Sequence, residues 1–473
     1  MSGTKSLNSL DRMFLAGETH EALMHVGVLV PFSPPAPAEG SDAAAPPAYD
    51  LLRPLMEELK RNPGAHPPWN LKLRHPELLS SPLQAWIEDD DFDVDYHVRR
   101  SALPSPGDER ELGVLVSRLH SHKLDFHRPP WEAHFIEGLE GGRFAIYFKV
   151  HHSLIDGYSG MRYLMRSLSP DPADRDTPMF YTLPPAAAPG RHDDDPAATL
   201  DHIFHALRDQ VSATRDAGKA LLNVVRATRD HDATLVSPLQ APRSVINQKI
   251  SRNRRFATQK YSAERLRRVA KAHGGTLNDM VLALCAAGLR RFLLERGALP
   301  DKPMTAMLPV NIRPKNDPGG GNAVGAILAT LATDVADPVA RLDTIITSTR
   351  RAKEQLQGMS RSAIMQYSTL LMAPAFLTQI PGAAGRLPPA FNLVVSNVPG
   401  SETPLYFRGW RAEALYPLSI PFAGYGLNIT VNGYAGMLCF GFIGCRDAVP
   451  HLQRLAVYSG EALEELEATL PPS

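Results

Sequence analysis

The sequence predicts an α/β fold in two halves, because strand-like and helix-like segments alternate and a proline-rich stretch lies between them. A chain of 473 residues is too long for one ordinary core and favours at least two domains. Residues 170–196 are rich in proline, alanine and aspartate, with little to bury. We therefore expect an N-terminal domain over residues 1–180, a linker over 181–198 and a C-terminal domain over 199–473.

Regular patterns mark the elements of each half. In the N-terminal half we expect a helix over 9–16, a strand over 24–32, a hairpin of strands 133–139 and 143–151 closed by Glu140-Gly-Gly, and a helix over 161–168. In the C-terminal half we expect a long helix over 199–229, a strand over 255–261, a helix over 263–273 and a helix over 280–292 that begins at the capping box Thr276-x-x-Asp279. Trp131 and Phe135 are expected in the core.

Composition excludes several classes of protein. Lysine plus arginine and aspartate plus glutamate both number 50, so the chain lacks the basic excess of a nucleic-acid-binding protein. The 3 cysteines have no metal-ligand spacing and indicate reduced thiols. No apolar stretch reaches the roughly 18 to 20 residues that span a bilayer, and the N-terminus lacks the apolar core of a signal peptide. We expect a cytoplasmic protein, with peripheral contact to the inner membrane face or to lipid inclusions left open.

The stretch that carries chemistry is His151-His152-Ser-Leu-Ile-Asp156-Gly157, where an expected strand ends in a loop. Adjacent strand residues point to opposite faces, so the two histidines are poorly placed to share a metal ion and only one should face a cleft. A neutral imidazole there can accept a proton from an alcohol. Asp156 could fix the loop by pairing with an arginine, and Gly157 would let the backbone bend close to the site. The alternative is a pair of structural histidines packed against a turn.

Seven ordered motifs extend this signature along nearly the whole chain. They are Met24-His-Val-Gly27, Phe92-Asp-Val-Asp-Tyr-His-Val-Arg99, Arg128-Pro-Pro-Trp131, Ile136-Glu-Gly-Leu139, Asn278-Asp-Met-Val-Leu-Ala283, Pro309-Val-Asn-Ile-Arg313 with Gly321-Asn322, and Ser396-Asn-Val-Pro-Gly400. In these motifs the chain resembles the bacterial wax ester synthase/diacylglycerol acyltransferases, within the superfamily of coenzyme-A-dependent acyltransferases of the chloramphenicol-acetyltransferase-like fold. Pro130 stands where that family usually has leucine, a departure that concerns only local packing.

The resemblance implies two chloramphenicol-acetyltransferase-like domains, with mixed sheets flanked by helices and an active-site channel between them. It implies transfer of a long-chain acyl group from acyl-CoA to a long-chain alcohol or to diacylglycerol, with no permanently bound cofactor and no metal. His152 would be the general base and Asp156 would hold the site, with His151, Gly157 and Asn278 beside them. The resemblance also implies substrate contacts, for His25, Gly27, Asp279, Arg313, Asn322, Ser396 and Asn397.

Plainer interpretations remain open for several of these residues. Asn278 and Asp279 also fit a helix start, Arg313 and Asn322 a structural turn, and His25 a buried hydrogen-bonded histidine. The basic residues Lys249, Arg252, Arg254 and Arg255 fit either coenzyme A phosphates or a solvated loop. Two rival functions are condensation-type amide formation on the same fold and non-catalytic lipid binding. An α/β-hydrolase is disfavoured, because no Gly-x-Ser-x-Gly motif is present.

Overall fold

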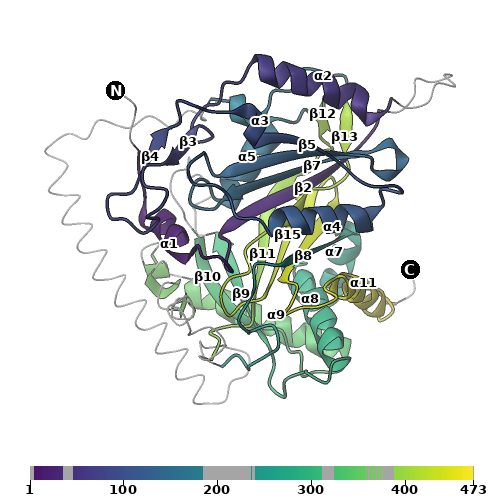
Figure 1. The fold of residues 1–473 in the computed structure, drawn as a ribbon. Helices are drawn as coiled ribbons and strands as arrows, with labels where there is room; N and C mark the ends of the chain where they lie inside the picture. The colour runs from purple at the N-terminus through teal and green to yellow at the C-terminus, as the bar shows by residue number, and fades with distance from the viewer. Residues whose placement is uncertain are drawn as a thin grey trace, which may run out of the picture.

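The computed structural model describes residues 5–35, 46–184, 236, 240–311, 324–357, 359–360, 363–364, 366–368, 371–372, 375 and 388–471. Within these ranges the fold is α/β, with two large sheets and one small one (Figure 1). Each large sheet has its own hydrophobic core. The predicted class, α/β with mixed sheets flanked by helices, is confirmed.

The first large sheet carries the histidine motif at one end. In spatial order its strands are β12 (Tyr406–Phe407), β13 (Trp410–Ala412), β2 (His25–Ser33), β7 (Phe144–His151), β6 (Trp131–Glu137) and β5 (Val98–Ala102). β2, β7 and β6 pair antiparallel, and β5 is parallel to β6. Trp131 and Phe135 are fully buried, as predicted.

The second large sheet comes from the C-terminal half. In spatial order its strands are β10 (Val324–Thr330), β9 (Thr305–Asn311), β11 (Leu393–Ser401), β15 (Leu427–Tyr434), β16 (Met437–Cys445) and β8 (Arg254–Ser262). Its helices are α7 (Ala263–Ala272), α8 (Leu277–Leu294), α9 (Pro338–Leu356) and α11 (Gln453–Glu467). Figure 1 shows these helices together in the lower half of the molecule, and their apolar faces join the core of this sheet.

Three helices of the N-terminal half set the position of the histidine motif and of the contact between the two halves of the chain. They are α2 (Ala48–Arg61), α4 (Glu109–His120) and α5 (Gly157–Arg166). α4 packs against β8 of the second sheet. Two backbone amides of β8 donate to hydroxyls at the end of α4, Phe256 to Ser117 at 3.0 Å and Arg254 to Ser121 at 2.8 Å. α5 packs against β11, so both contacts bring residues of the second half next to the first sheet.

Residues 406–418 leave the C-terminal half and complete the first sheet; we call them the crossing segment. β13 pairs with β2, and so does the short β14 (Tyr416–Leu418). A Cβ at Gly441 would lie 1.8 Å from the Pro417 carbonyl oxygen, so glycine is required where β14 passes over β16. Arg408 then holds the segment to α2 through a bidentate ion pair with Glu58, at 2.6 and 2.8 Å.

The N-terminus forms a small module beside the first sheet. Helix α1 (Ser9–Gly17) lies next to a three-stranded sheet of β1 (Lys5–Ser6), β4 (Ala85–Glu88) and β3 (Leu71–Leu73). Asn8 and Asp11 form a capping box that fixes the start of α1. Arg12 of α1 donates to the carbonyl oxygens of Ser81 and Gln84, at 3.2 and 3.3 Å, and so joins the helix to the loop before β4.

Most predicted elements lie where the sequence patterns placed them, including the hairpin and the capped helix α8. α5 begins at Gly157, four residues before the predicted start at 161, because Asp156 already caps it. The predicted helix over 199–229 and nearly all of the linker over 181–198 lie outside the described residues. The three cysteines are free and buried, as expected for reduced thiols.

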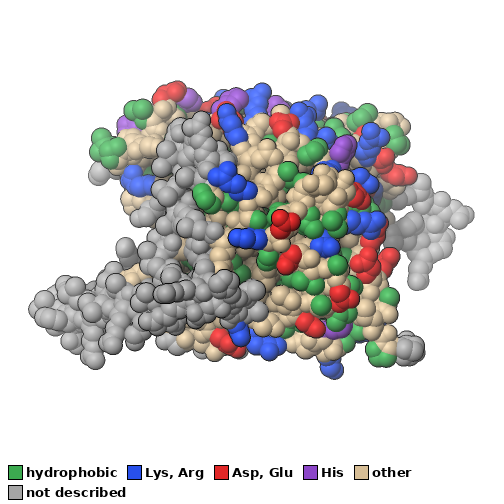
Figure 2. Space-filling view, turned by 90° about the horizontal axis from the view of Figure 1, so that it is seen from below, with side chains coloured by type: hydrophobic (Ala, Val, Ile, Leu, Met, Phe, Trp, Pro, Cys, Tyr) green, Lys and Arg blue, Asp and Glu red, His purple; other side chains and the backbone are tan. Residues whose placement is uncertain are grey.

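Charge is evenly spread in the view of Figure 2, where basic and acidic side chains are interspersed over the described surface. Among the described residues, no helix is both long and apolar enough to cross a bilayer.

Candidate active site

His152 lies directly after β7, at the end of the first sheet. Its backbone amide donates to the carbonyl oxygen of Met24 at 2.9 Å, which ties it to the start of β2. Its half-buried ring stacks on Phe14 of α1, with ring centroids 4.0 Å apart. Nδ1 is buried and forms no hydrogen bond with a neighbouring residue, so Nε2 is the ring nitrogen that we expect a reactant to meet. Three separate segments therefore fix the position of this imidazole.

His151 occupies different surroundings, as strand alternation predicts. It lies opposite His25 in the β2–β7 pairing and is 1% exposed. Its Nδ1 accepts from the Ser153 backbone amide at 3.2 Å, so the proton of the neutral ring is on Nε2. That Nε2 lies 3.6 Å from a carboxylate oxygen of the buried Glu18. His151 is thus enclosed by protein and is not available to a substrate.

Electrostatics keep His152 neutral near physiological pH. Burial lowers its pKa to about 4, because the charged imidazolium loses solvation. The Asp156 carboxylate opposes this shift by stabilising the protonated ring, and His151 acts in the same direction as burial. The result is an unprotonated imidazole with a carboxylate nearby to stabilise the cation once a proton arrives.

Asp156 is the N-cap of α5. Its carboxylate accepts from the Ser159 backbone amide at 2.7 Å and from the Ser159 hydroxyl at 3.2 Å. The predicted ion pair with an arginine is not found among the described residues, because the helix start occupies this carboxylate instead. The loop geometry is therefore set by a helix cap.

Gly157 is the first residue of α5. Its φ lies outside the left-handed region, and a Cβ there would meet no atom within 4 Å. Neither a positive φ nor crowding by neighbouring atoms therefore requires glycine at this position. The missing side chain instead leaves open space beside Asp156.

Asn278 and Asn397 come together from distant parts of the C-terminal half. Asn397 Nδ2, on β11, donates to Asn278 Oδ1 at the start of α8, at 2.9 Å, and both side chains are exposed. This bond orients the Asn278 amide so that its Nδ2 remains free to donate. Ser396, the preceding residue of β11, is half-buried. Because β11 packs against α5, the asparagine pair belongs to the part of the second half that adjoins the histidine motif.

Asp279 is structural, and its predicted contact with substrate is not supported. It is 2% exposed. One carboxylate oxygen accepts from the amide and hydroxyl of Thr276, both at 2.7 Å, and the other accepts from the Thr349 hydroxyl at 2.6 Å. With both oxygens occupied, Asp279 joins the start of α8 to α9.

His25 and Gly27 lie on the first sheet, and the surroundings of His25 fit the plainer alternative, a buried hydrogen-bonded histidine. They share the face of His151, since residues paired across antiparallel strands project to the same side. His25 is 1% exposed, and its Nε2 is hydrogen-bonded to the carbonyl oxygen of His120 at 2.9 Å. At Gly27 a Cβ would lie 2.7 Å from the Phe148 carbonyl oxygen, so this glycine permits close packing of β2 on β7.

Arg313 and Asn322, also predicted to contact substrate, lie outside the described residues. In the basic cluster, Arg254 is 3% exposed and donates to the carbonyl oxygens of Ser251 and Glu21. Arg254 therefore joins β8 to the N-terminal segment. Neither of the two predicted interpretations, a solvated loop or a contact with coenzyme A phosphates, fits this residue.

Phe14 and Glu18 shape the site but were not foreseen. Phe14 stacks on His152, and Glu18 accepts from the Met24 amide at 2.5 Å while facing His151. Their signal in the sequence is weak, because an apolar residue on a short helix and a glutamate just after it are common. Only their contacts in space reveal a role.

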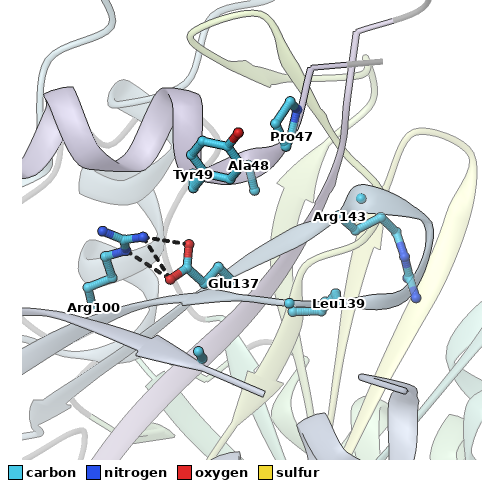
Figure 3. Close-up of a pocket in the computed structure, with 10 residues that line it drawn as sticks. Pro47, Ala48, Tyr49, Arg100, Glu137, Leu139 and Arg143 are labelled. Atoms are coloured by element: carbon cyan, nitrogen blue, oxygen red, sulfur yellow. Dashed lines mark hydrogen bonds and ion pairs between the residues drawn. The ribbon is translucent and has the colours of Figure 1, made fainter. Parts of the chain in front are cut away.

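The described residues hold no group of three or more His, Cys, Asp or Glu side chains that could bind a metal ion. An open pocket elsewhere is lined by Pro47, Ala48, Tyr49, Arg100, Ala102, Glu137, Gly138, Leu139, Gly142 and Arg143 (Figure 3). In that view Arg100 points to Glu137, with which it forms an ion pair. Arg143 and His152 lie at opposite ends of β7, roughly 25–30 Å apart at the usual rise per strand residue. The pocket is therefore separate from the histidine site.

Comparisons with known proteins point to one family. Residues 7–281 match the family described as the wax ester synthase/diacylglycerol acyltransferase catalytic domain, and residues 320–467 match the C-terminal domain of the same family. The chain is 51% identical to a Mycobacterium tuberculosis protein provisionally named a diacylglycerol O-acyltransferase, over 98% of this chain and 97% of that protein.

Two solved structures are also similar. The wax ester synthase/diacylglycerol acyltransferase from Marinobacter aquaeolei is 37% identical, with a TM-score of 0.76 over 98% of this chain and 99% of that one. The first condensation domain of the calcium-dependent antibiotic synthetase is 18% identical, with a TM-score of 0.57 over 98% and 95%. The second likeness concerns the fold alone.

Proposed function

Because the chain belongs to the wax ester synthase/diacylglycerol acyltransferase family and is an O-acyltransferase, we propose that it moves a long-chain acyl group from acyl-coenzyme A to a lipid hydroxyl. The acceptor is a long-chain alcohol, which yields a wax ester, or diacylglycerol, which yields triacylglycerol. Both substrates are small molecules or lipids, and neither nucleic acid nor a permanently bound cofactor takes part.

The observation that carries the proposal is His152, fixed by three segments and neutral because burial lowers its pKa. Nε2 accepts the proton of the alcohol as its oxygen attacks the thioester carbonyl carbon. The tetrahedral oxyanion then collapses, the carbon–sulfur bond breaks, and the thiolate of coenzyme A takes the proton back from the imidazolium. No covalent enzyme intermediate is required, since thiolate leaves readily. A positioned base of this kind contributes about 10²–10⁴-fold.

Two further groups support the charges that appear during this reaction. Asp156 stabilises the imidazolium, as the direction of its influence on the pKa of His152 indicates. Asn278 is a candidate donor to the oxyanion, because Asn397 occupies its Oδ1 and leaves Nδ2 free. One well-placed oxyanion donor is worth about 10²–10³-fold in rate.

We place the protein in the cytoplasm, in transient contact with a membrane or with lipid inclusions. Diacylglycerol and long-chain alcohols partition into lipid, so the enzyme must meet them at a lipid surface. The acyl-coenzyme A donor, in contrast, approaches from water.

The direct test is release of free thiol from palmitoyl-coenzyme A, with hexadecanol, dioleoylglycerol and short alcohols as acceptors and formation of the ester as a second readout. We expect His152→Ala to lower turnover by about 10²-fold or more, with its melting temperature retained. His151→Ala should instead mainly lower the melting temperature, because that ring is buried and hydrogen-bonded. Exposed His122 provides the matched control, and His122→Ala should change neither the turnover nor the melting temperature.

Three outcomes would refute the proposal. Thiol release at the wild-type rate by both His151→Ala and His152→Ala would exclude a histidine base. Bound acyl chains without thiol release by the wild-type protein would favour non-catalytic lipid binding, and activity with an acyl-carrier protein but not with acyl-coenzyme A would favour a condensation-type donor.

A further inference from the structure

The two most exposed large hydrophobic side chains among the described residues belong to one loop. Leu83 is 73% exposed and Leu78 is 66% exposed. Both lie in residues 74–84, which connect β3 to β4 and which we call the leucine loop. Single exposed hydrophobic side chains are common on folded proteins, but these two lie within six positions of each other and so concentrate apolar surface on one loop.

The leucine loop is an ordered structure. The Arg74 amide donates to the Ala85 carbonyl oxygen at 2.9 Å and closes its base. Gln84, 2% exposed, fills its interior and exchanges hydrogen bonds with the His75 backbone at 2.9 and 3.0 Å. Leu79 turns inward and packs against the first core. The loop therefore holds Leu78 and Leu83 outward in a fixed arrangement.

The loop is joined to the active site through α1. Arg12 donates to the backbone of the loop at Ser81 and Gln84, at 3.2 and 3.3 Å. Two residues further along the same helix, Phe14 stacks on the His152 ring. The short helix α1 thus connects the loop that carries the exposed leucines to His152, the proposed general base.

We propose that the leucine loop is the surface that docks the enzyme onto a lipid bilayer or inclusion, with Leu78 and Leu83 inserted among the lipids. This inference rests on the proposed function, in which the acceptor is a lipid. Residues 78–84 contain no charged side chain, so the tip can enter an interface without desolvating an ion. The tip has far fewer residues than the roughly 20–30 that each partner contributes to a stable protein interface. It suffices for shallow insertion into a lipid surface.

Flotation with phosphatidylcholine vesicles that contain dioleoylglycerol tests the docking. The full chain with Leu78→Ser and Leu83→Ser should partition onto vesicles about tenfold or more weakly than wild type, since most of the inserted apolar surface is removed. The matched control is the pair Leu294→Ser and Val457→Ser, which removes side chains of 51% and 53% exposure from α8 and α11. That control should float like wild type.

Leu83→Trp gives a second readout. The four native tryptophans, Trp69, Trp86, Trp131 and Trp410, are at most 3% exposed and should not respond to vesicles. The emission of the added indole should shift to shorter wavelength when vesicles are present. An unchanged spectrum, or equal flotation of the loop and control variants, would overturn the inference. Loss of a dimer in the loop variant, with flotation unchanged, would instead assign the loop to contact with a second copy of the chain.

Failure of the inference can be distinguished from failure of the proposed function. With a short alcohol in solution, the loop variant should release thiol at the wild-type rate; with vesicle-borne dioleoylglycerol, its rate should fall with its binding. If the wild type releases no thiol with any acceptor, the proposed function fails, whereas flotation still reports on docking. If the loop variant loses activity equally with both acceptors, the loop is part of the catalytic structure and docking is refuted.

Discussion

His152 combines two properties that a general base needs, a fixed position and an unprotonated ring. Stacking on Phe14 and the bond of its amide to Met24 fix the imidazole, and burial disfavours its charged form. A free histidine would be partly protonated at pH 6, since its ordinary pKa is about 6.5. Here the base form persists to lower pH.

The first prediction concerns the acid limb of activity. With the pKa of His152 lowered to about 4, kcat/KM should stay level as the pH falls from 7 to about 5 and then decline with a midpoint near 4. Brief assays with palmitoyl-coenzyme A, paired with circular dichroism at each pH, would separate titration from unfolding. A midpoint near 6.5 in folded protein would mean that His152 is solvated in the working enzyme.

Among the single elements, the start of α5 shows how one side chain can cap a helix and also act on the titration of a neighbouring histidine. Asp156 caps the helix through Ser159 and also raises the pKa of His152. The helix begins at Gly157 for this reason, earlier than apolar periodicity alone predicts. Capping fixes where the carboxylate lies, and its charge then acts on the imidazole.

The second prediction separates these two roles of Asp156. Asp156→Asn should keep the cap, because asparagine caps helices about as well as aspartate, while turnover falls about tenfold through loss of the charge. Asp156→Ala should lose the same activity and also about 1 kcal/mol of stability. Turnover and thermal melting of both variants check this. A normal turnover for Asp156→Asn would show that the residue is only a cap.

Across the fold, four of the described histidines share a buried environment. His25, His97, His120 and His134 are each at most 2% exposed, and burial is the largest cause lowering the pKa of every one. They are hydrogen-bonded in the neutral form, for example His97 Nδ1 to the Trp131 carbonyl oxygen at 2.8 Å. Protonation therefore favours the unfolded chain.

The third prediction is a loss of stability in mild acid. A histidine with a folded pKa below its unfolded value of about 6.5 binds fewer protons when folded, so its stabilisation is complete above that pH and declines as the pH falls toward the folded pKa. For His97 this window runs from about 6.5 to about 4. The melting temperature should therefore fall steadily between pH 7 and pH 5.

His97→Gln provides a control for this effect, since glutamine can hydrogen-bond but does not titrate in this range. The melting temperature of the variant should depend less steeply on pH than that of the wild type, whatever its value at pH 7. Equal slopes would show that His97 is already solvated in the folded protein.

Sequence patterns alone predict the α/β class, the hairpin, the capped helix α8 and the position of the histidine motif at a strand end. These features follow from local rules, because periodicity, glycine turns and capping boxes act between residues a few positions apart. The separation of His151 from His152 was predictable for the same reason, since alternation is a property of a single strand.

Which residues meet at the site depends on contacts between segments that are distant in the chain. The tertiary structure brought Phe14 onto His152, paired Asn397 with Asn278 across 119 positions, and placed the crossing segment in the first sheet. It also enclosed His25 and Asp279, for which the sequence left both a substrate contact and a structural role open. Such contacts depend on how two separately formed cores pack together. The free energy of this packing is a sum over many side chains that are distant in the sequence, so it leaves no local pattern in the chain.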